Sequence, residues 1–304
     1  MIKDAERQEK DEILHLWKLC YPTQDEAYLR FYFDHIYDDG ITVVKKQDDL
    51  IISSLHMNYH VMNFHGKLLK CSYLLGASTL PDYRRRGHFN ALMESMLDEA
   101  EHNCLISFMK AFNPKAYARY GFEVVYERKA YTIGKAYLHG IKPLRVFDHA
   151  TAEELLYIYK QFTKRFDGYH VRDIKYYELL LEELRLGGKQ LSVYRNEHRE
   201  VKGYVISTLR KNEVIVHEAV YMDSAILKRL LKKALGVHEE ITLVVSKHEH
   251  IEKVFPLAIP KNQPYLMARI NNYQLFNKLY NGKARNVKEA FAIVRKPLWN
   301  HEYY

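Results

Sequence analysis

The stretch Ser72–Glu101, SYLLGASTLPDYRRRGHFNALMESMLDEAE, decides the fold, because it predicts a strand, a basic turn and a helix in direct succession. Residues 72–80 are rich in residue types that suit a pleated strand, and Pro81-Asp82 ends that run. The apolar side chains that follow recur with the spacing of one helical face, at Phe89, Leu92, Met93, Met96 and Leu97. Three arginines and a glycine, Arg84–Gly87, fill the turn between strand and helix.

This turn has the residue types that bind an anion. The start of a helix presents backbone N–H groups without partners and carries a partial positive charge. Gly87 permits a backbone conformation, or a close approach of a ligand, that a Cβ atom would prevent. The arginines supply charge that pairs with phosphate, so the turn predicts a pyrophosphate site. A solvated basic turn that caps an ordinary helix is the alternative, because a single glycine at a helix start is a weak signal.

The pattern Arg84-x-x-Gly87-x-Phe89 resembles the Arg/Gln-x-x-Gly-x-Gly/Ala signature of the GNAT N-acetyltransferases, which bind the pyrophosphate of acetyl-CoA on those amides. The longer phrase GASTLPDYRRRG, Gly76–Gly87, resembles the enhanced-intracellular-survival (Eis) branch, whose members often carry a bulkier residue where this chain has Phe89. The resemblance implies acetyl-CoA as the cofactor. The residues it places at the cofactor are Ala77, Ser78, Thr79, Leu80, Arg84, Arg85, Arg86, Gly87, His88, Phe89, Asn90 and Asn113.

Composition indicates a globular protein of the cytoplasm. The 304 residues are 47% apolar and 28% charged, which is enough for two domains with large cores. No apolar run reaches the roughly 18 to 20 residues that span a bilayer, and the charged start lacks a signal-peptide core. The three cysteines are odd in number and lie in apolar context, which favours reduced thiols. No Cys or His cluster has metal-ligand spacing, so no metal is expected.

The net charge of +8 and the pI near 9.1 allow nucleic acid, an acidic membrane or a polyanionic cofactor as partners. Lysines and arginines are spread along the chain, and no block of consecutive basic residues exceeds three. This distribution is weak evidence for nucleic acid, and a CoA site accounts for part of the excess.

Residues 1–138 are predicted to form the acetyltransferase domain. The pattern predicts helices over 11–19 and 26–36 and from Phe89 onward, and strands over 41–45, 50–63, 68–75, 72–80 and 104–109, with a last strand through Ile133. A short helix stops at Gly121 before that last strand. This order of elements is that of the GNAT fold.

Residues 139–260 are predicted to form a second, degenerate GNAT-like domain. Its expected helices span 153–166, 173–184 and 225–235, and its expected strands span 190–195, 201–209, 213–221 and 241–246. Asp223 is expected to cap the third helix. The turn before that helix, Tyr221–Ser224, has no glycine and no arginine, so this half is expected to bind no cofactor.

Residues 261–304 are predicted to form a truncated, sterol-carrier-like C-terminal segment. Met267–Phe276 resembles the family's entry into a third domain, and Pro297–Tyr304 resembles the family's chain end. The prediction for the whole chain is therefore an α/β (α+β) fold of tandem GNAT-like domains, each with a mixed, mostly antiparallel sheet flanked by helices, plus a short extension.

Acetyl transfer to an amine requires a thioester held beside the nucleophile and hydrogen-bond donors for the oxyanion, which the edge of Gly76–Leu80 could supply. The resemblance places Tyr117 as the general acid that protonates the departing thiolate. A half-buried core residue is the alternative, since the chain has 25 tyrosines. Tyr120 competes for the role but matches a position that is usually a packing aromatic. Asn113 could equally be the N-cap of a helix that begins at Pro114.

The resemblance makes the α-carboxylate of Tyr304 a candidate base, because Eis-type proteins deliver their C-terminal carboxylate into the acetyltransferase site. A free carboxylate accepts hydrogen bonds and is anionic at neutral pH. A frayed terminus is the alternative. Asp25 and Glu26 could line a pocket for a cationic acceptor, or could simply be solvated.

The leading hypothesis is an acetyl-CoA-dependent N-acetyltransferase that acts on an amine by direct transfer. No Cys or Ser lies in a nucleophile motif, which agrees with direct transfer. The family resemblance favours a cationic small-molecule acceptor such as an aminoglycoside, a polyamine or a lysine side chain. A CoA-binding regulatory module without turnover and a nucleic-acid-associated protein are the competing hypotheses, and a homo-oligomer is left open.

Overall fold

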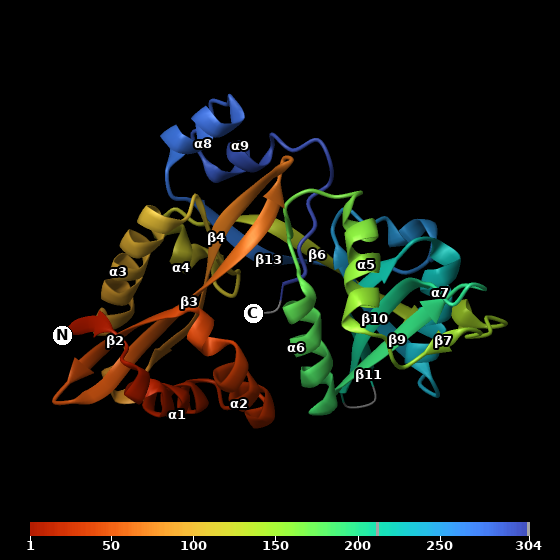
Figure 1. Ribbon diagram of the computed structural model, residues 1–304, viewed down its shortest axis with the longest axis horizontal. Helices are drawn as coiled ribbons and strands as arrows, with labels where there is room; N and C mark the ends of the chain where they lie inside the picture. The colour runs from red at the N-terminus through yellow and green to blue at the C-terminus, as the bar shows by residue number, and fades with distance from the viewer. Residues whose placement is uncertain (211–212, 303–304) are drawn as a thin grey trace.

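One sheet runs through both halves of the chain (Figure 1). The computed structural model describes residues 1–210 and 213–302. The strands within them are β1 (Ile2–Asp4), β2 (Ile41–Gln47), β3 (Leu50–Phe64), β4 (Lys67–Thr79), β5 (Ile106–Lys110), β6 (Glu123–Gly134), β7 (Val146–Phe147), β8 (Tyr169–His170), β9 (Lys189–Arg195), β10 (Val201–Arg210), β11 (Glu213–Tyr221), β12 (Glu240–Ser246) and β13 (Pro260–Ile270). They join in the order β1-β2-β3-β4-β5-β13-β6-β12-β11-β10-β9-β7, and β8 pairs with β3.

The sheet is mixed and mostly antiparallel, as the sequence predicted. Within the described residues only two pairs of neighbouring strands are parallel, β4 with β5 and β11 with β12. Each parallel pair is connected through a helix, as a parallel crossover requires. These helices are α3 (His88–Asn103) and α7 (Ser224–Leu235). Each half of the chain therefore contains an antiparallel meander followed by a strand–helix–strand unit.

Helices cover both faces of the sheet. The remaining ones are α1 (Lys10–Cys20), α2 (Glu26–His35), α4 (Pro114–Tyr117), α5 (Ala152–Thr163), α6 (Ile174–Arg185), α8 (Tyr273–Tyr280) and α9 (Val287–Phe291). In the first half, α3 packs on one face of β2–β5, while α1 and α2 pack on the other. In the second half, α7 covers one face, and α5 and α6 cover the other. None of the described helices is long and apolar enough to span a bilayer.

The helices begin where the sequence has capping residues. Asp223 accepts a hydrogen bond from the backbone N–H of Ile226 at the start of α7, as predicted. Thr151 and Glu154 form a capping box at the start of α5. Asn113 caps α4 through the N–H of Ala116. The predicted elements are all present, with ends that differ by a few residues. The two runs expected over 68–75 and 72–80 form the single long strand β4.

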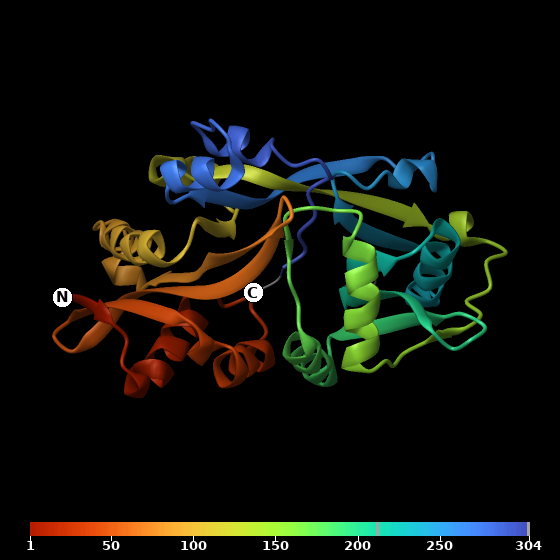
Figure 2. The same cartoon turned by 45° about the horizontal axis from the view of Figure 1, so that its top comes forward.

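The last strand, β13, lies between two strands of the first half. It pairs with β5 over Leu266–Ile270 and with β6 from Pro260 onward. Figure 2 shows β6 and β13 side by side as they cross from one half of the molecule to the other. β6 continues into the second half, where it pairs with β12. Residues 261–304 thus supply a central strand, and α8 and α9 pack near it. The division at 138/139 and 260/261 stays a proposal about folding units.

Candidate functional site

Strand β4 has a β-bulge at the position where the candidate site begins. Between Leu75 and Ser78, β4 contains one residue more than the facing part of β3. Gly76 takes a φ of +64°, and a Cβ atom there would lie 1.8 Å from a ring carbon of Trp17, so only glycine fits. β4 pairs with β5 over Cys71–Leu74 only. Beyond Leu74 the two strands separate, and the end of β4 is left to line a cavity.

The basic turn that follows, Arg84–His88, leads directly into α3. Arg85 and Gly87 both have positive φ, +61° and +79°. Gly87 is the N-cap of α3, and no side chain caps the first N–H groups of this helix. The first turn of α3 also lacks acidic residues. The helix start therefore presents backbone donors and a partial positive charge, without an anionic side chain of its own.

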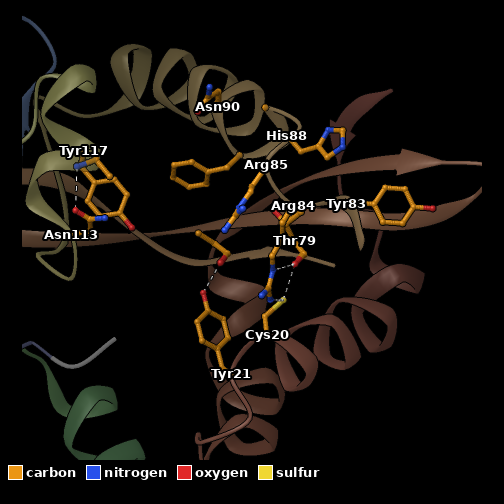
Figure 3. A pocket seen from close by; sticks show the side chains of 14 residues that line it. Cys20, Tyr21, Thr79, Tyr83, Arg84, Arg85, His88, Asn90, Asn113 and Tyr117 are labelled. Carbon is orange, nitrogen blue, oxygen red and sulfur yellow. Dashed lines mark hydrogen bonds between the residues drawn. The ribbon is translucent and has the colours of Figure 1, made fainter. Parts of the chain in front are cut away.

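A cavity of about 600 Å³ lies between the end of β4, the start of α3 and α4 (Figure 3). We refer to it as the cofactor cavity. It brings together most of the residues that the sequence placed at the cofactor. Those that line it are Ala77, Thr79, Arg84, Arg85, Gly87, His88, Phe89, Asn90, Asn113 and Tyr117.

Three predicted residues do not line this cavity. The hydroxyl of Ser78 is turned to the carbonyl of Gly76, at 3.1 Å. Leu80 packs in the core beside α1 and α2. The guanidinium of Arg86 lies over the ring of Tyr83, 5.5 Å from its centre. A fourth predicted residue, Tyr304, is outside the described residues.

Arg84 is held against the strand and the first helix. Its Nε donates to the carbonyl of Thr79 at 3.0 Å, and its terminal nitrogen lies 3.8 Å from Sγ of Cys20 (Figure 3). His88, in contrast, has no hydrogen-bond partner for either ring nitrogen among the described residues. Burial, with Lys45 and Arg86 nearby, lowers the pKa of His88, so this ring is held neutral at the start of α3.

Tyr117 is the last residue of α4 and lies across the cavity from the basic turn (Figure 3). Its ring packs against Phe89, with 6.1 Å between ring centres. Burial raises the pKa of Tyr117, which keeps its hydroxyl protonated. The competing residue Tyr120 is not part of the lining, and its hydroxyl donates to Oδ1 of Asn90 at 2.7 Å.

The sequence interpretation missed four lining residues, Cys20, Tyr21, Tyr83 and Ala116. Cys20 and Tyr21 were read as part of a loop between two helices. The hydroxyl of Tyr21 donates to the carbonyl of Ala77 at 2.6 Å, and burial of that group raises its pKa to about 12. The contact holds the end of β4 on the loop after α1. No local sequence signal marks a tyrosine for this role, since the contact spans 56 positions.

The predicted acceptor acids are already engaged. Asp25 accepts hydrogen bonds from the N–H groups of Ala27 and Tyr28, at 2.8 and 3.4 Å, as the N-cap of α2. Glu26 pairs with Lys18 at 2.6 Å and with Arg30 at 3.4 Å. Within residues 1–210 and 213–302, no three His, Cys, Asp or Glu side chains are placed to hold a metal ion.

Residues 1–125 match the family model of the acetyltransferase (GNAT) domain. No curated protein matches the chain. Solved structures share the fold at low sequence identity. A conserved Enterococcus faecalis protein, described as a probable N-acyltransferase, is 20% identical with a TM-score of 0.78, and the match covers 90% of this chain and 73% of that one.

Two further structures match over the same length. A GCN5-related N-acetyltransferase from Anabaena variabilis is 15% identical with a TM-score of 0.75, over 90% of this chain and 73% of that one. Eis1 from Mycobacterium abscessus is 15% identical with a TM-score of 0.69, over 91% of this chain and 75% of that one. Because each match covers about 90% of this chain, the likeness extends over both of its halves.

Proposed function

We propose that this chain, whose residues 1–125 are an acetyltransferase (GNAT) domain, transfers the acetyl group of acetyl-CoA directly to an amine. The observation that carries the proposal is the cofactor cavity. It joins an uncapped helix start, two arginines, the free end of β4 and a protonated tyrosine in one space of about 600 Å³. Each is a part that acetyl transfer from a thioester requires.

The start of α3 fits a diphosphate. Its first N–H groups have no capping side chain, and Arg84 and Arg85 line the same space. Oriented N–H groups and arginines are the usual partners of phosphate oxygens. We assign this end of the cavity to the pyrophosphate of acetyl-CoA, and the wall formed by Ala77, Thr79 and Asn113 to the arm that carries the thioester.

The equivalent helix of the second half differs at this point. The carboxylate of Asp223 accepts from the N–H of Ile226 at 2.9 Å, so the start of α7 already holds an anion. A phosphate that bound there would have to compete with the carboxylate of Asp223 for the same N–H group and would be repelled by its negative charge. The proposal therefore assigns one cofactor site to the chain, in its first half.

Transfer forms a C–N bond and breaks the C–S bond of the thioester. The acceptor loses one proton from an ammonium of pKa about 10 before attack and a second from the same nitrogen as the amide forms, while the departing thiolate gains one, so that one proton is released overall. We assign the proton that the thiolate gains to the hydroxyl of Tyr117, which lines the cavity and whose pKa is raised by burial. The second proton of the amine then restores that hydroxyl. Backbone N–H groups at the end of β4 are the proposed donors to the oxyanion.

For the base, the α-carboxylate of Tyr304 remains the proposal. Support comes from the chain that precedes it. The side chain of Trp299 is buried, with 1% of the residue exposed, and its backbone N–H donates to the carbonyl of Asp167 at 3.0 Å. Glu302 is buried, and its carboxylate pairs with His170 and lies 3.8 Å from Nε of Arg172. This segment is anchored in the interior between the two halves of the chain.

Two measurements on the whole chain test the proposal. Acetyl-CoA should raise the melting temperature through mass action, and CoA should be released when amines are added. A thermal shift without CoA release from any amine would favour a binding module without turnover. The absence of both would reject the site. Addition of one residue after Tyr304 tests the base, and unchanged CoA release in that variant would reject it.

A further inference from the structure

Residues 77–79, at the end of β4, have a neighbouring strand on one side only. On that side Ser78 is opposite Ser54 of β3. On the other side β5 pairs with β4 only as far as Leu74, and within the described residues no other strand takes its place. Ala77 and Thr79 line the cofactor cavity on this unpaired side. We refer to the unpaired side of residues 77–79 as the open edge of β4.

The ladder with β3 determines which backbone groups face the open edge. The N–H of Leu80 donates to the carbonyl of Ile52 at 3.0 Å, so Leu80 and, two residues earlier, Ser78 direct their backbone groups to β3. The N–H and C=O groups of one strand residue point to the same side, and successive residues alternate. Ala77 and Thr79 therefore direct both groups to the open edge.

Side chains already occupy both carbonyls of the open edge (Figure 3). The hydroxyl of Tyr21 donates to the carbonyl of Ala77 at 2.6 Å. Nε of Arg84 donates to the carbonyl of Thr79 at 3.0 Å, and Sγ of Cys20 lies 3.4 Å from the same oxygen. In the described part of the chain, the groups that the open edge keeps for a ligand are therefore the two N–H groups.

The peptide units that carry these N–H groups are polarised from behind. The carbonyl of Gly76 accepts from Oγ of Ser78 at 3.1 Å, and the carbonyl of Ser78 accepts from Oγ of Ser53 at 2.7 Å. The first carbonyl shares its peptide unit with the N–H of Ala77, and the second with the N–H of Thr79. A hydrogen bond to the carbonyl of a peptide unit strengthens its N–H as a donor.

Tyr21 reaches Ala77 from the loop after α1. Its ring packs edge-on against Trp17, with 6.3 Å between ring centres, and Trp17 also packs against Gly76 of the bulge. Burial raises the pKa of Tyr21 to about 12, and Tyr117 adds to the shift. The hydroxyl of Tyr21 therefore keeps its proton at neutral pH and remains a donor.

We propose that Tyr21 is a positioning residue for acetyl transfer, which occupies the carbonyl of Ala77 so that the open edge presents only N–H donors to the thioester oxygen. This inference deepens the function proposed above and depends on it. Tyr21 moves no proton in this role. Without its hydroxyl, the carbonyl of Ala77 would direct a partial negative charge toward the developing oxyanion, and the end of β4 would lose its contact with the loop after α1.

Tyr21→Phe tests the proposal, because it keeps the ring and removes the hydroxyl. The variant should lower kcat for CoA release at least about tenfold, which is less than the 10²- to 10³-fold typical of a lost direct donor to the oxyanion. Its affinity for CoA, which has no acetyl group, should equal that of the wild type in calorimetry. A loosened structure would weaken CoA binding as well.

Infrared spectroscopy follows the thioester without turnover. Acetyl-CoA labelled with carbon-13 at its thioester carbonyl is bound to the whole chain with no amine present. Hydrogen bonds to the oxygen weaken the C=O bond, so the band of the bound thioester should lie at a lower wavenumber than that of free acetyl-CoA. In Tyr21→Phe the band should return part of the way to the free position.

Tyr280→Phe is the matched control. The hydroxyl of Tyr280 donates to the carbonyl of Phe64, the last residue of β3, at 2.9 Å and outside the cofactor cavity. This variant also loses one hydroxyl-to-carbonyl hydrogen bond at a strand end, and it should keep the kcat and the infrared band of the wild type.

Wild-type kcat in Tyr21→Phe, an unchanged infrared band, or a loss of CoA affinity in step with kcat would overturn the inference. Turnover by the wild type with a band that does not depend on Tyr21 keeps the proposed function and rejects the role of Tyr21. A band that depends on Tyr21, without CoA release to any amine, keeps that role and rejects the proposed turnover. Failure of the wild type to bind acetyl-CoA rejects both.

Discussion

Tyr117 is the residue on which the proposed proton transfer depends. It lines the cofactor cavity on α4, opposite the basic turn, and burial keeps its hydroxyl protonated. Its neighbour Tyr120 has the same chemistry but a different contact, since its hydroxyl is bound to Asn90. The two tyrosines therefore form a matched pair for a test.

Tyr117→Phe should lower kcat by roughly 10²- to 10⁴-fold, because the departing thiolate loses its proton donor. The thermal shift caused by acetyl-CoA should persist, since the ring still lines the cavity. Steady-state CoA release and melting curves measure the two effects. Tyr120→Phe is the control and should retain most of its activity. Wild-type turnover in Tyr117→Phe would remove this residue as the acid.

Glu249, in the second half of the chain, is a second residue whose substitution has a measurable effect, here on the pH dependence of stability. Its buried carboxyl accepts from Trp299 Nε1, at 3.2 Å, from Tyr221 and from the N–H of Ser246, yet burial raises its pKa to about 7. The folded protein therefore retains this proton in a range where the unfolded chain has lost it. The protonated carboxyl of Glu249 therefore contributes to the stability of the folded state. This contribution is fully present below the ordinary pKa of a carboxyl group and is lost as the pH rises through about 7.

Glu249→Gln should therefore reduce the fall in melting temperature between about pH 5 and about pH 8, because glutamine keeps an acceptor and cannot ionise. Thermal denaturation at the two pH values measures the difference. A variant whose melting temperature falls as steeply as that of the wild type would show that Glu249 does not carry this dependence.

At the scale of elements, the starts of α3 and α7 differ in whether a side chain already occupies the first N–H groups of the helix. Both helices follow a strand and lead into a parallel neighbour. Gly87 leaves the first N–H groups of α3 without a side-chain cap, whereas the carboxylate of Asp223 caps α7 through the N–H of Ile226. The difference lies in a single capping residue at each helix.

Gly87→Glu should abolish the thermal shift caused by acetyl-CoA, because a carboxylate at the N-cap occupies the helix start and repels phosphate. Nothing lies within 4 Å of the Cβ position, so the strain comes only from the positive φ of +79°. Gly140→Glu is a matched control, with φ +74° and equally open space. It should lose similar stability and keep the shift. A normal shift in Gly87→Glu would place the diphosphate elsewhere.

At the scale of the whole molecule, β13 joins the C-terminal part of the chain to the sheet of the first half. The first half cannot close its sheet alone, because β5 and β6 do not pair with each other and β13 lies between them. The same strand is followed by the segment that carries Trp299 and Glu302 into the interior. The C-terminal segment thus completes the sheet beside the site.

A chain that ends at residue 258 should fail to fold cooperatively, because removal of β13 exposes the edges of two central strands and opens the core beneath them. Size-exclusion chromatography and thermal denaturation measure this outcome. Co-expression with residues 259–304 as a separate chain should restore soluble protein. A truncated chain that melts cooperatively and binds acetyl-CoA would contradict the role assigned to β13.

Local sequence determined most of the elements and the centre of the cofactor cavity. The strand, basic turn and helix of Ser72–Glu101 lie next to one another in the chain, so their periodicity and turn residues predicted them and brought Arg84–Asn90 to one place. The caps at Asn113 and Asp223 were predictable for the same reason, since each cap binds an N–H only three positions away.

The tertiary structure decided what depends on distant contacts. The insertion of β13 between β5 and β6 and the contact of Tyr21 with Ala77 each join residues far apart in sequence. No short pattern encodes them, because they follow from how the sheet orders its strands.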